Sequence, residues 1–175
     1  MRKSLPLSLT VLLALSSLHC GYSTHSRFID QYRTVFVGPV ENTIDFTREQ
    51  RRNFYFPLLE VKIHDAVVDR FLYDGNLRSA EADRADLIME VKLSDYTRGA
   101  LRYTDDDDVE ESRIQIVSHV RLKEALTGNV LWNRTIVGEA TYFTRGALAT
   151  SERSAVDEAV ADLARRIVEQ TVQYW

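Results

Sequence analysis

The chain has 175 residues, a formal net charge of −4, 45% hydrophobic residues and a single cysteine. This length suits one domain with its own core, and the apolar content excludes a disordered chain. The acidic balance argues against a general nucleic-acid binder, whose affinity depends on neutralising phosphates with basic side chains.

The first nineteen residues have the pattern of an export signal. Arg2 and Lys3 supply positive charge, and residues 5–18 contain no charged side chain. Such a run is shorter than the roughly 20 apolar residues that span a bilayer, but it fits a secretory signal. We therefore expect residues 1–19 to be removed. The rest of the chain then has 20 basic against 26 acidic side chains, a net charge of −6.

Cys20 directly follows this apolar run. A lone cysteine cannot form an internal disulfide, which leaves an intermolecular pair, a free thiol or a modification. Its position resembles that of a bacterial lipoprotein signal, in which the cysteine becomes the lipidated first residue of the mature protein. We expect Cys20 to be lipidated and residues 20–31 to be a tether, because two or more acyl chains anchor a protein stably. The alternative is cleavage by an ordinary signal peptidase, with Cys20 left unmodified.

Residues 32–175 are predicted to form a single domain that begins with a strand and a helix. Residues 32–40 are rich in β-branched and aromatic side chains and end at Gly38-Pro39, which is typical of a strand. Residues 57–73 place apolar side chains at helical spacing, and Asp74-Gly75 should end the helix. The apolar stripe consists of Leu59, Ile63, Ala66, Val67 and Phe71.

Three further strands are predicted from alternating apolar and polar residues, over 86–96, 113–122 and 130–142. The first two are joined by residues 98–112, which contain six carboxylates and should form a hairpin connection. The last two are joined by a tight turn at Thr127-Gly128-Asn129. Consecutive strands with short connections indicate an antiparallel meander.

A final helix is predicted after residue 150. Ser151 or Ser154 can cap its N-terminus, and its apolar stripe consists of Val156, Val160, Leu163, Ile167 and Thr171. The element order is strand, helix, three strands, helix. We expect an α+β fold, a two-layer sandwich in which two helices cover one face of a mostly antiparallel four-stranded sheet.

Five short segments in this order resemble the LptE family of lipopolysaccharide-assembly lipoproteins. They are Cys-Gly-Tyr at 20–22, VGPVENT at 37–43, ADLIMEV at 85–91, TGNVLW at 127–132 and ADLARRIVEQ at 161–170. The resemblance implies a small α/β sandwich held at the inner leaflet of the outer membrane. It further implies a subunit that plugs the LptD β-barrel translocon, helps that barrel to assemble and binds lipopolysaccharide.

Catalytic and cofactor motifs are absent from the sequence. There is no HExxH, no paired cysteine ligands, no phosphate-binding glycine loop and no GxSxG elbow. The acidic run from Asp105 to Asp108 suits a divalent cation by ligand type, but it lacks the glycine of an EF-hand loop. We favour a solvated hairpin tip and expect no catalytic residue, metal or cofactor.

Basic residues on the predicted strands are the candidate contacts for lipopolysaccharide, because arginine binds phosphate in a bidentate manner. The candidates are Arg98, Arg102, Arg121 and Lys123, with Arg113 and Arg134 nearby. The alternative is that these side chains only keep an open sheet face soluble. For the whole protein, the alternative to a translocon subunit is a membrane-anchored periplasmic adaptor that binds another envelope protein through the sheet or its edge.

Overall fold

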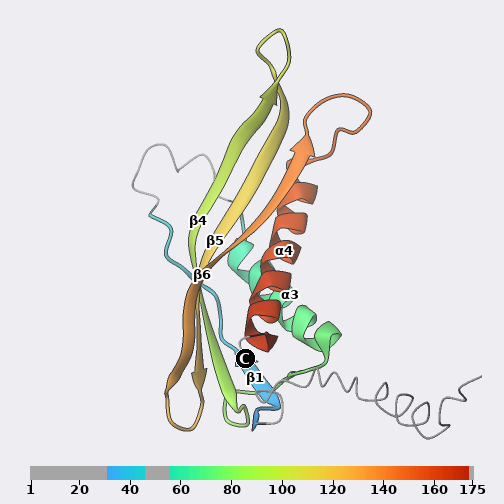
Figure 1. The fold of residues 1–175 in the computed structure, drawn as a ribbon. Coiled ribbons are helices and arrows are strands. Elements are labelled where there is room, and N and C mark those ends of the chain that lie inside the picture. The colour runs from blue at the N-terminus through green and yellow to red at the C-terminus, as the bar shows by residue number, and fades with distance from the viewer. Residues whose placement is uncertain (1–30, 46–55, 174–175) are drawn as a thin grey trace, which may run out of the picture.

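The computed structural model describes residues 31–45 and 56–173. The predicted signal peptide, Cys20 and nearly all of the predicted tether lie outside the described residues. Within them, two helices lie on one side of a single sheet (Figure 1). The α+β class is therefore confirmed.

The sheet has six strands and is mixed, so the prediction of a mostly antiparallel four-stranded sheet was only partly right. Its strands are β1 (Thr34–Val37), β2 (Glu41–Asn42), β3 (Arg78–Ser79), β4 (Leu87–Tyr103), β5 (Val109–Glu124) and β6 (Val130–Phe143). The order is β3-β1-β4-β5-β6, and β2 also pairs with β4. The meander of β4, β5 and β6 is antiparallel, as predicted, whereas β1 runs parallel to both β3 and β4.

The strands of the first hairpin are longer than predicted. Residues 98–103 and 109–112, expected to be a connection, continue β4 and β5 and leave only a short turn. The reason is that their backbones pair across the hairpin although most of their side chains are exposed or half-buried. Figure 1 shows this hairpin extending past the helices.

The helix α3 (Leu59–Asp74) buries Leu59, Ile63, Val67 and Phe71 of the predicted stripe, and its fifth member, Ala66, is half-buried against the core. It ends at Gly75, which has a φ of 76° and donates its N–H to the Phe71 carbonyl. A left-handed residue at this position is the usual glycine stop of a helix. The predicted end of α3 is thus confirmed.

The helix α4 (Glu152–Val172) buries all five residues of its predicted stripe. Ser151 is the N-cap, since its side chain accepts the N–H of Ser154 at 3.1 Å. This contact identifies Ser151, and not Ser154, as the N-cap of α4. The helix lies against β5 and β6 and beside α3, so its apolar stripe closes the core.

Gly138 of β6 allows α4 to approach the sheet closely. A Cβ atom at this position would lie 2.4 Å from both the Ala159 carbonyl oxygen and the Leu163 Cβ. At the same place, the carboxylate of Asp162 accepts the backbone N–H of Glu139 at 3.1 Å. One turn of α4 is therefore seated directly on the outer strand.

Candidate functional site

The four predicted basic residues do not form one patch. Arg121 and Lys123 alternate with the buried residues of β5 and so lie on the sheet face that is turned away from the helices. Arg98 pairs in register with Ile114, which is buried on the helix face, so Arg98 lies on that side. Arg102 lies near the end of the long hairpin, opposite Glu111.

Arg121 and Lys123 share one carboxylate, that of Glu90 on β4. Lys123 donates to one oxygen of Glu90, and an Arg121 nitrogen lies 3.5 Å from the other. The hydrogen bond from Lys123 lowers the pKa of Glu90, which therefore stays ionised. Lys92, also on this face, lies 2.7 Å from Glu41. Three cations thus face two carboxylates, which leaves a small local excess of positive charge.

Arg98 is tied to the start of α4. Its guanidinium lies 2.5 Å from the carboxylate of Glu152, which also accepts the Tyr96 hydroxyl at 3.2 Å. Burial of Tyr96, together with the nearby Glu152, raises the pKa of this phenol. These contacts join the hairpin to the first turn of α4, a structural role that the sequence did not indicate.

The acidic tip, residues Asp105–Asp108, is an ordered turn between β4 and β5. The Thr104 N–H donates to the Asp108 carbonyl at 2.8 Å, and Asp107 has a φ of 62°. Arg145 lies 2.7 Å from the Asp108 carboxylate. Arg102 lies within 4.0 Å of both Glu110 and Glu111. No group of three side chains suited to a metal ion occurs in the described part of the chain.

Arg113 and Arg134 also lie apart. Arg113 is half-buried on the same face as Arg121, with its Nε buried and without a hydrogen-bond partner. Arg134 is on β6 opposite Val120 and donates to the Gln170 side chain of α4 at 3.2 Å. Arg113 therefore extends the basic side of the open face toward the acidic tip, whereas Arg134 belongs to the helix side.

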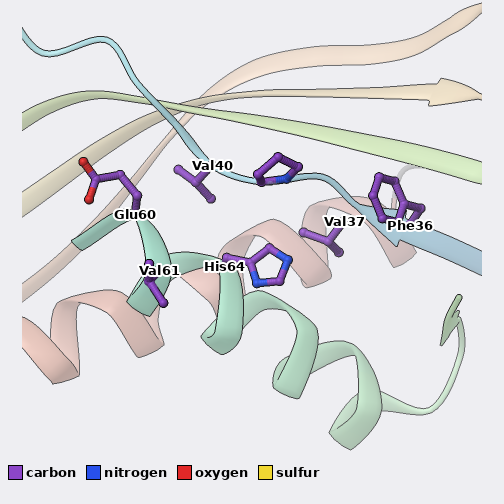
Figure 2. Close-up of a pocket in the computed structure, with 7 residues that line it drawn as sticks. Phe36, Val37, Val40, Glu60, Val61 and His64 are labelled. Carbon is purple, nitrogen blue, oxygen red and sulfur yellow. The ribbon is translucent and has the colours of Figure 1, made fainter. Parts of the chain in front are cut away.

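Sequence reasoning missed an apolar pocket between β1 and α3 (Figure 2). Its volume is about 310 Å³. Glu60, Val61 and His64 line it from α3, and the other wall comes from β1 and the chain that follows it, including Phe36 and Pro39. The ladder of β1 stops near Pro39, because proline has no N–H to donate. The chain beyond β1 and the facing side of α3 enclose a hollow that can hold an apolar group.

A second hollow, of about 440 Å³, lies on the open face and shares Phe36 with the first. It is lined by apolar Pro39 and Ile88 and by the charged Glu41, Glu90, Lys92 and Arg121. Apolar surface and charged groups thus lie side by side here, with two carboxylates balancing two cations. The sequence pointed to Arg121 but not to the hollow, because its walls come from strands that are about fifty residues apart.

The family comparison covers most of the chain. A family model described as LptE, lipopolysaccharide-assembly, matches residues 32–171. No curated protein matches the sequence. In the described residues, neither helix is long and apolar enough to cross a membrane.

Solved structures share the fold at low sequence identity. A hypothetical protein from Chlamydia trachomatis is 12% identical, with a TM-score of 0.55 over 82% of this chain and 97% of that one. An uncharacterized lipoprotein B from Nitrosomonas europaea is 13% identical, also with a TM-score of 0.55, over 82% of this chain and 84% of that one. These similarities support the fold alone.

Proposed function

Because the chain belongs to the LptE lipopolysaccharide-assembly family, we propose that it is a non-enzymatic outer-membrane lipoprotein that assists assembly of an LptD-type β-barrel translocon and plugs its lumen. The observation that carries the proposal is the match of the family model to residues 32–171, which include every described strand and helix apart from the last residue of α4. The narrow two-layer shape, with a long hairpin at one end, is compatible with insertion into a barrel (Figure 1).

The proposed location is the periplasmic face of the outer membrane. Cys20 is the proposed site of lipidation, since it follows the apolar run of the export signal. Several acyl chains on one cysteine would make the attachment stable, because each buried CH₂ contributes about 0.8 kcal/mol. The domain would then act while tethered to the bilayer by residues 20–31.

The proposed ligand is lipopolysaccharide, a glycolipid with phosphate groups and acyl chains. Arg121 and Lys123 on the open face suit its phosphates, and the adjoining hollow beside Phe36 supplies apolar surface. Arg98 and Arg102 remain candidates, and all four residues would have to exchange a carboxylate partner for the ligand. With a mature net charge of −6, binding would depend on local contacts and should weaken with salt.

Depletion of the protein tests the assembly role. We expect less correctly folded barrel and less surface lipopolysaccharide, both measured in outer-membrane fractions. A pull-down from the same fractions should capture a large β-barrel protein. Normal barrel levels after depletion would refute the assembly role, and capture of a different envelope protein would favour the adaptor alternative.

Two double variants test the basic residues separately. Changing Arg121 and Lys123 to Ser should weaken lipopolysaccharide binding, whereas barrel assembly should stay normal. Changing Arg98 and Arg102 to Ser tests the other two candidates, on the helix face and at the hairpin end. Unchanged binding in both double variants, and in the fourfold variant, would remove these residues from the site without affecting the proposed plug role.

A further inference from the structure

One end of the sheet gathers the starts of β1, β3 and β4 and the end of β5. Arg78 of β3 pairs with Thr34 of β1, Val35 pairs with Leu87 at the start of β4, and Leu87 pairs with Glu124 at the end of β5. The end of α3 precedes β3 by only a few residues, and α3 contacts β3 at the other edge of the sheet from β5 and β6. We call this end of the sheet the Leu126 end, after the tip of the hairpin that joins β5 to β6.

The hairpin tip at the Leu126 end is uncharged and apolar. Residues 125–131 contain no acidic or basic side chain. Leu126 is 95% exposed, and Val130 is 54% exposed. The turn itself is well ordered: the Glu124 N–H donates to the Asn129 carbonyl at 2.9 Å, and Gly128 has a φ of 73°. The ordered turn therefore holds the Leu126 side chain in a fixed position where it is exposed to solvent.

A second apolar group lies at the end of α3. Leu72 is 63% exposed and Tyr73 is 83% exposed, and the Arg70 guanidinium lies 5.3 Å from the centre of the Tyr73 ring. Tyrosine and arginine with apolar neighbours are typical of surfaces that contact the headgroup region of a bilayer. The end of α3 thus also exposes apolar side chains, next to β3 at the other edge of the sheet.

The opposite end of the sheet has a different charge. Residues 104–111, at the turn between β4 and β5, carry six carboxylates and no basic side chain. Figure 1 shows the two hairpin turns at opposite ends of the molecule. Arg102 and Arg145 lie beside these carboxylates, so two cations face six anionic groups. A surface of anionic lipids would therefore repel the acidic tip more strongly than the tip at Leu126. Charge thus favours the orientation in which the Leu126 end, and not the acidic tip, faces the bilayer.

The chain that leads to Cys20 joins the domain at the Leu126 end. The Tyr32 hydroxyl donates to Glu124 at 2.5 Å, beside the hairpin tip. Residues 20–31 can span about 40 Å at most, so a lipid on Cys20 would keep this end near the bilayer. We propose that, in the tethered domain outside a barrel, the Leu126 end contacts the bilayer surface, with Leu126 inserted among the lipids and the acidic tip pointing away. This rests on the proposed lipidation of Cys20.

Depth-dependent quenching in lipid vesicles tests the orientation. The lipidated full-length protein is placed in vesicles of phosphatidylethanolamine and phosphatidylglycerol that contain a nitroxide lipid. A fluorescent label on Thr127→Cys should be quenched several-fold more strongly than the same label on Asp106→Cys. Adding Leu126→Asn to the Thr127→Cys protein should reduce that quenching. Adding Leu148→Asn should not, because Leu148 is 70% exposed but lies in the loop between β6 and α4, toward the acidic tip.

The outcomes separate the anchor from the orientation. Protein that fails to float with the vesicles refutes the lipid anchor and the orientation that depends on it. Protein that floats but shows equal quenching at the two positions refutes the orientation alone. A Thr127→Cys label that is shielded from aqueous quenchers but not quenched by the nitroxide lipid would indicate a protein contact, and would also refute the proposal.

Discussion

Gly138 of β6 and Leu163 of α4 are in such close contact that no side chain fits between them. The Leu163 Cβ and backbone nitrogen would lie 2.4 and 2.6 Å from a Cβ built on Gly138. A backbone atom cannot move aside as a flexible side chain can. The position of α4 over the outer strand therefore depends on the absence of one methyl group.

Replacing Gly138 with Ala should destabilise the domain by about 1–3 kcal/mol, the usual cost of overpacking a core. Urea unfolding followed by circular dichroism measures the loss. Gly99→Ala is the matched control, because nothing lies within 4 Å of a Cβ at Gly99 and that residue is also in a strand. Equal stability of the two variants would show that α4 does not approach β6 this closely.

Leu163 is fully buried at the centre of the helix stripe. Leu163→Ala should cost about 2–5 kcal/mol, because it removes apolar contacts and leaves a cavity. Leu148→Ala, at a residue that is 70% exposed, serves as the control and should change the free energy of unfolding little. A loss below about 0.5 kcal/mol for Leu163→Ala would contradict the two-layer packing.

Asp86 couples the start of β1 to acid stability. Its carboxylate accepts the N–H of Arg33 at 2.8 Å and both the N–H and the hydroxyl of Thr34 at 2.9 Å. The Arg33 hydrogen bond, helped by those from Thr34, outweighs the effect of burial and lowers the pKa of Asp86. In the unfolded chain this group titrates near about 4. Its contribution is thus complete above that pH and is lost as pH falls through the lower folded-state pKa.

Asp86→Asn should therefore lower stability at pH 7 and reduce the further loss between neutral and strongly acidic pH. Part of the pH dependence should remain, since hydrogen bonds also lower the pKa of Glu90 and Asp162. Urea midpoints measured at several pH values provide the test. The control is Asp83→Asn, at an exposed residue beside Arg84. A variant whose pH profile matches that of the unmodified protein would exclude Asp86 from acid unfolding.

Cys20→Ala should release the protein from the membrane into the soluble periplasmic fraction, because it removes the proposed site of acylation. Fractionation and incorporation of a labelled fatty acid provide the measurement. Cys20→Ser is a useful second variant, since it changes only one atom of the side chain. Membrane attachment that persists in both variants, with no label in the unmodified protein, would rule out this anchor.

The helix stripes and the antiparallel meander could be predicted from the sequence because each depends on a local period. Every stripe residue of α4 is buried as the spacing predicts. The alternation in 113–122 likewise predicts the buried face of β5, with Ile114, Ile116, Val120 and Leu122, and the structure adds Ser118 to it. Local patterns of this kind report which face of an element is covered, whatever covers it.

The sequence did not predict on which face of the sheet Arg98 lies, because the alternation of β4 is irregular. A bulge between Leu93 and Asp95 shifts the alternation of β4, so Arg98 faces the helices, and a second irregularity before Arg102 shifts it back. A bulge leaves little trace in one sequence, because the inserted residue, Ser94, is compatible with either face. The two-residue strands β2 and β3 and the parallel pairing of β1 were missed because they depend on partners far along the chain.

The contact between Asp162 and Glu139 also bears on self-association. A sheet grows from molecule to molecule when an incoming chain pairs with free N–H groups on an outer strand. Here the side chain of α4 already accepts the Glu139 N–H, and Arg166 stands beside it, 4.0 Å from the Glu139 carboxylate. An incoming chain would have to displace both groups at this point of β6. The helix that completes the core thus also hinders fibre-like polymerisation on its side of the sheet.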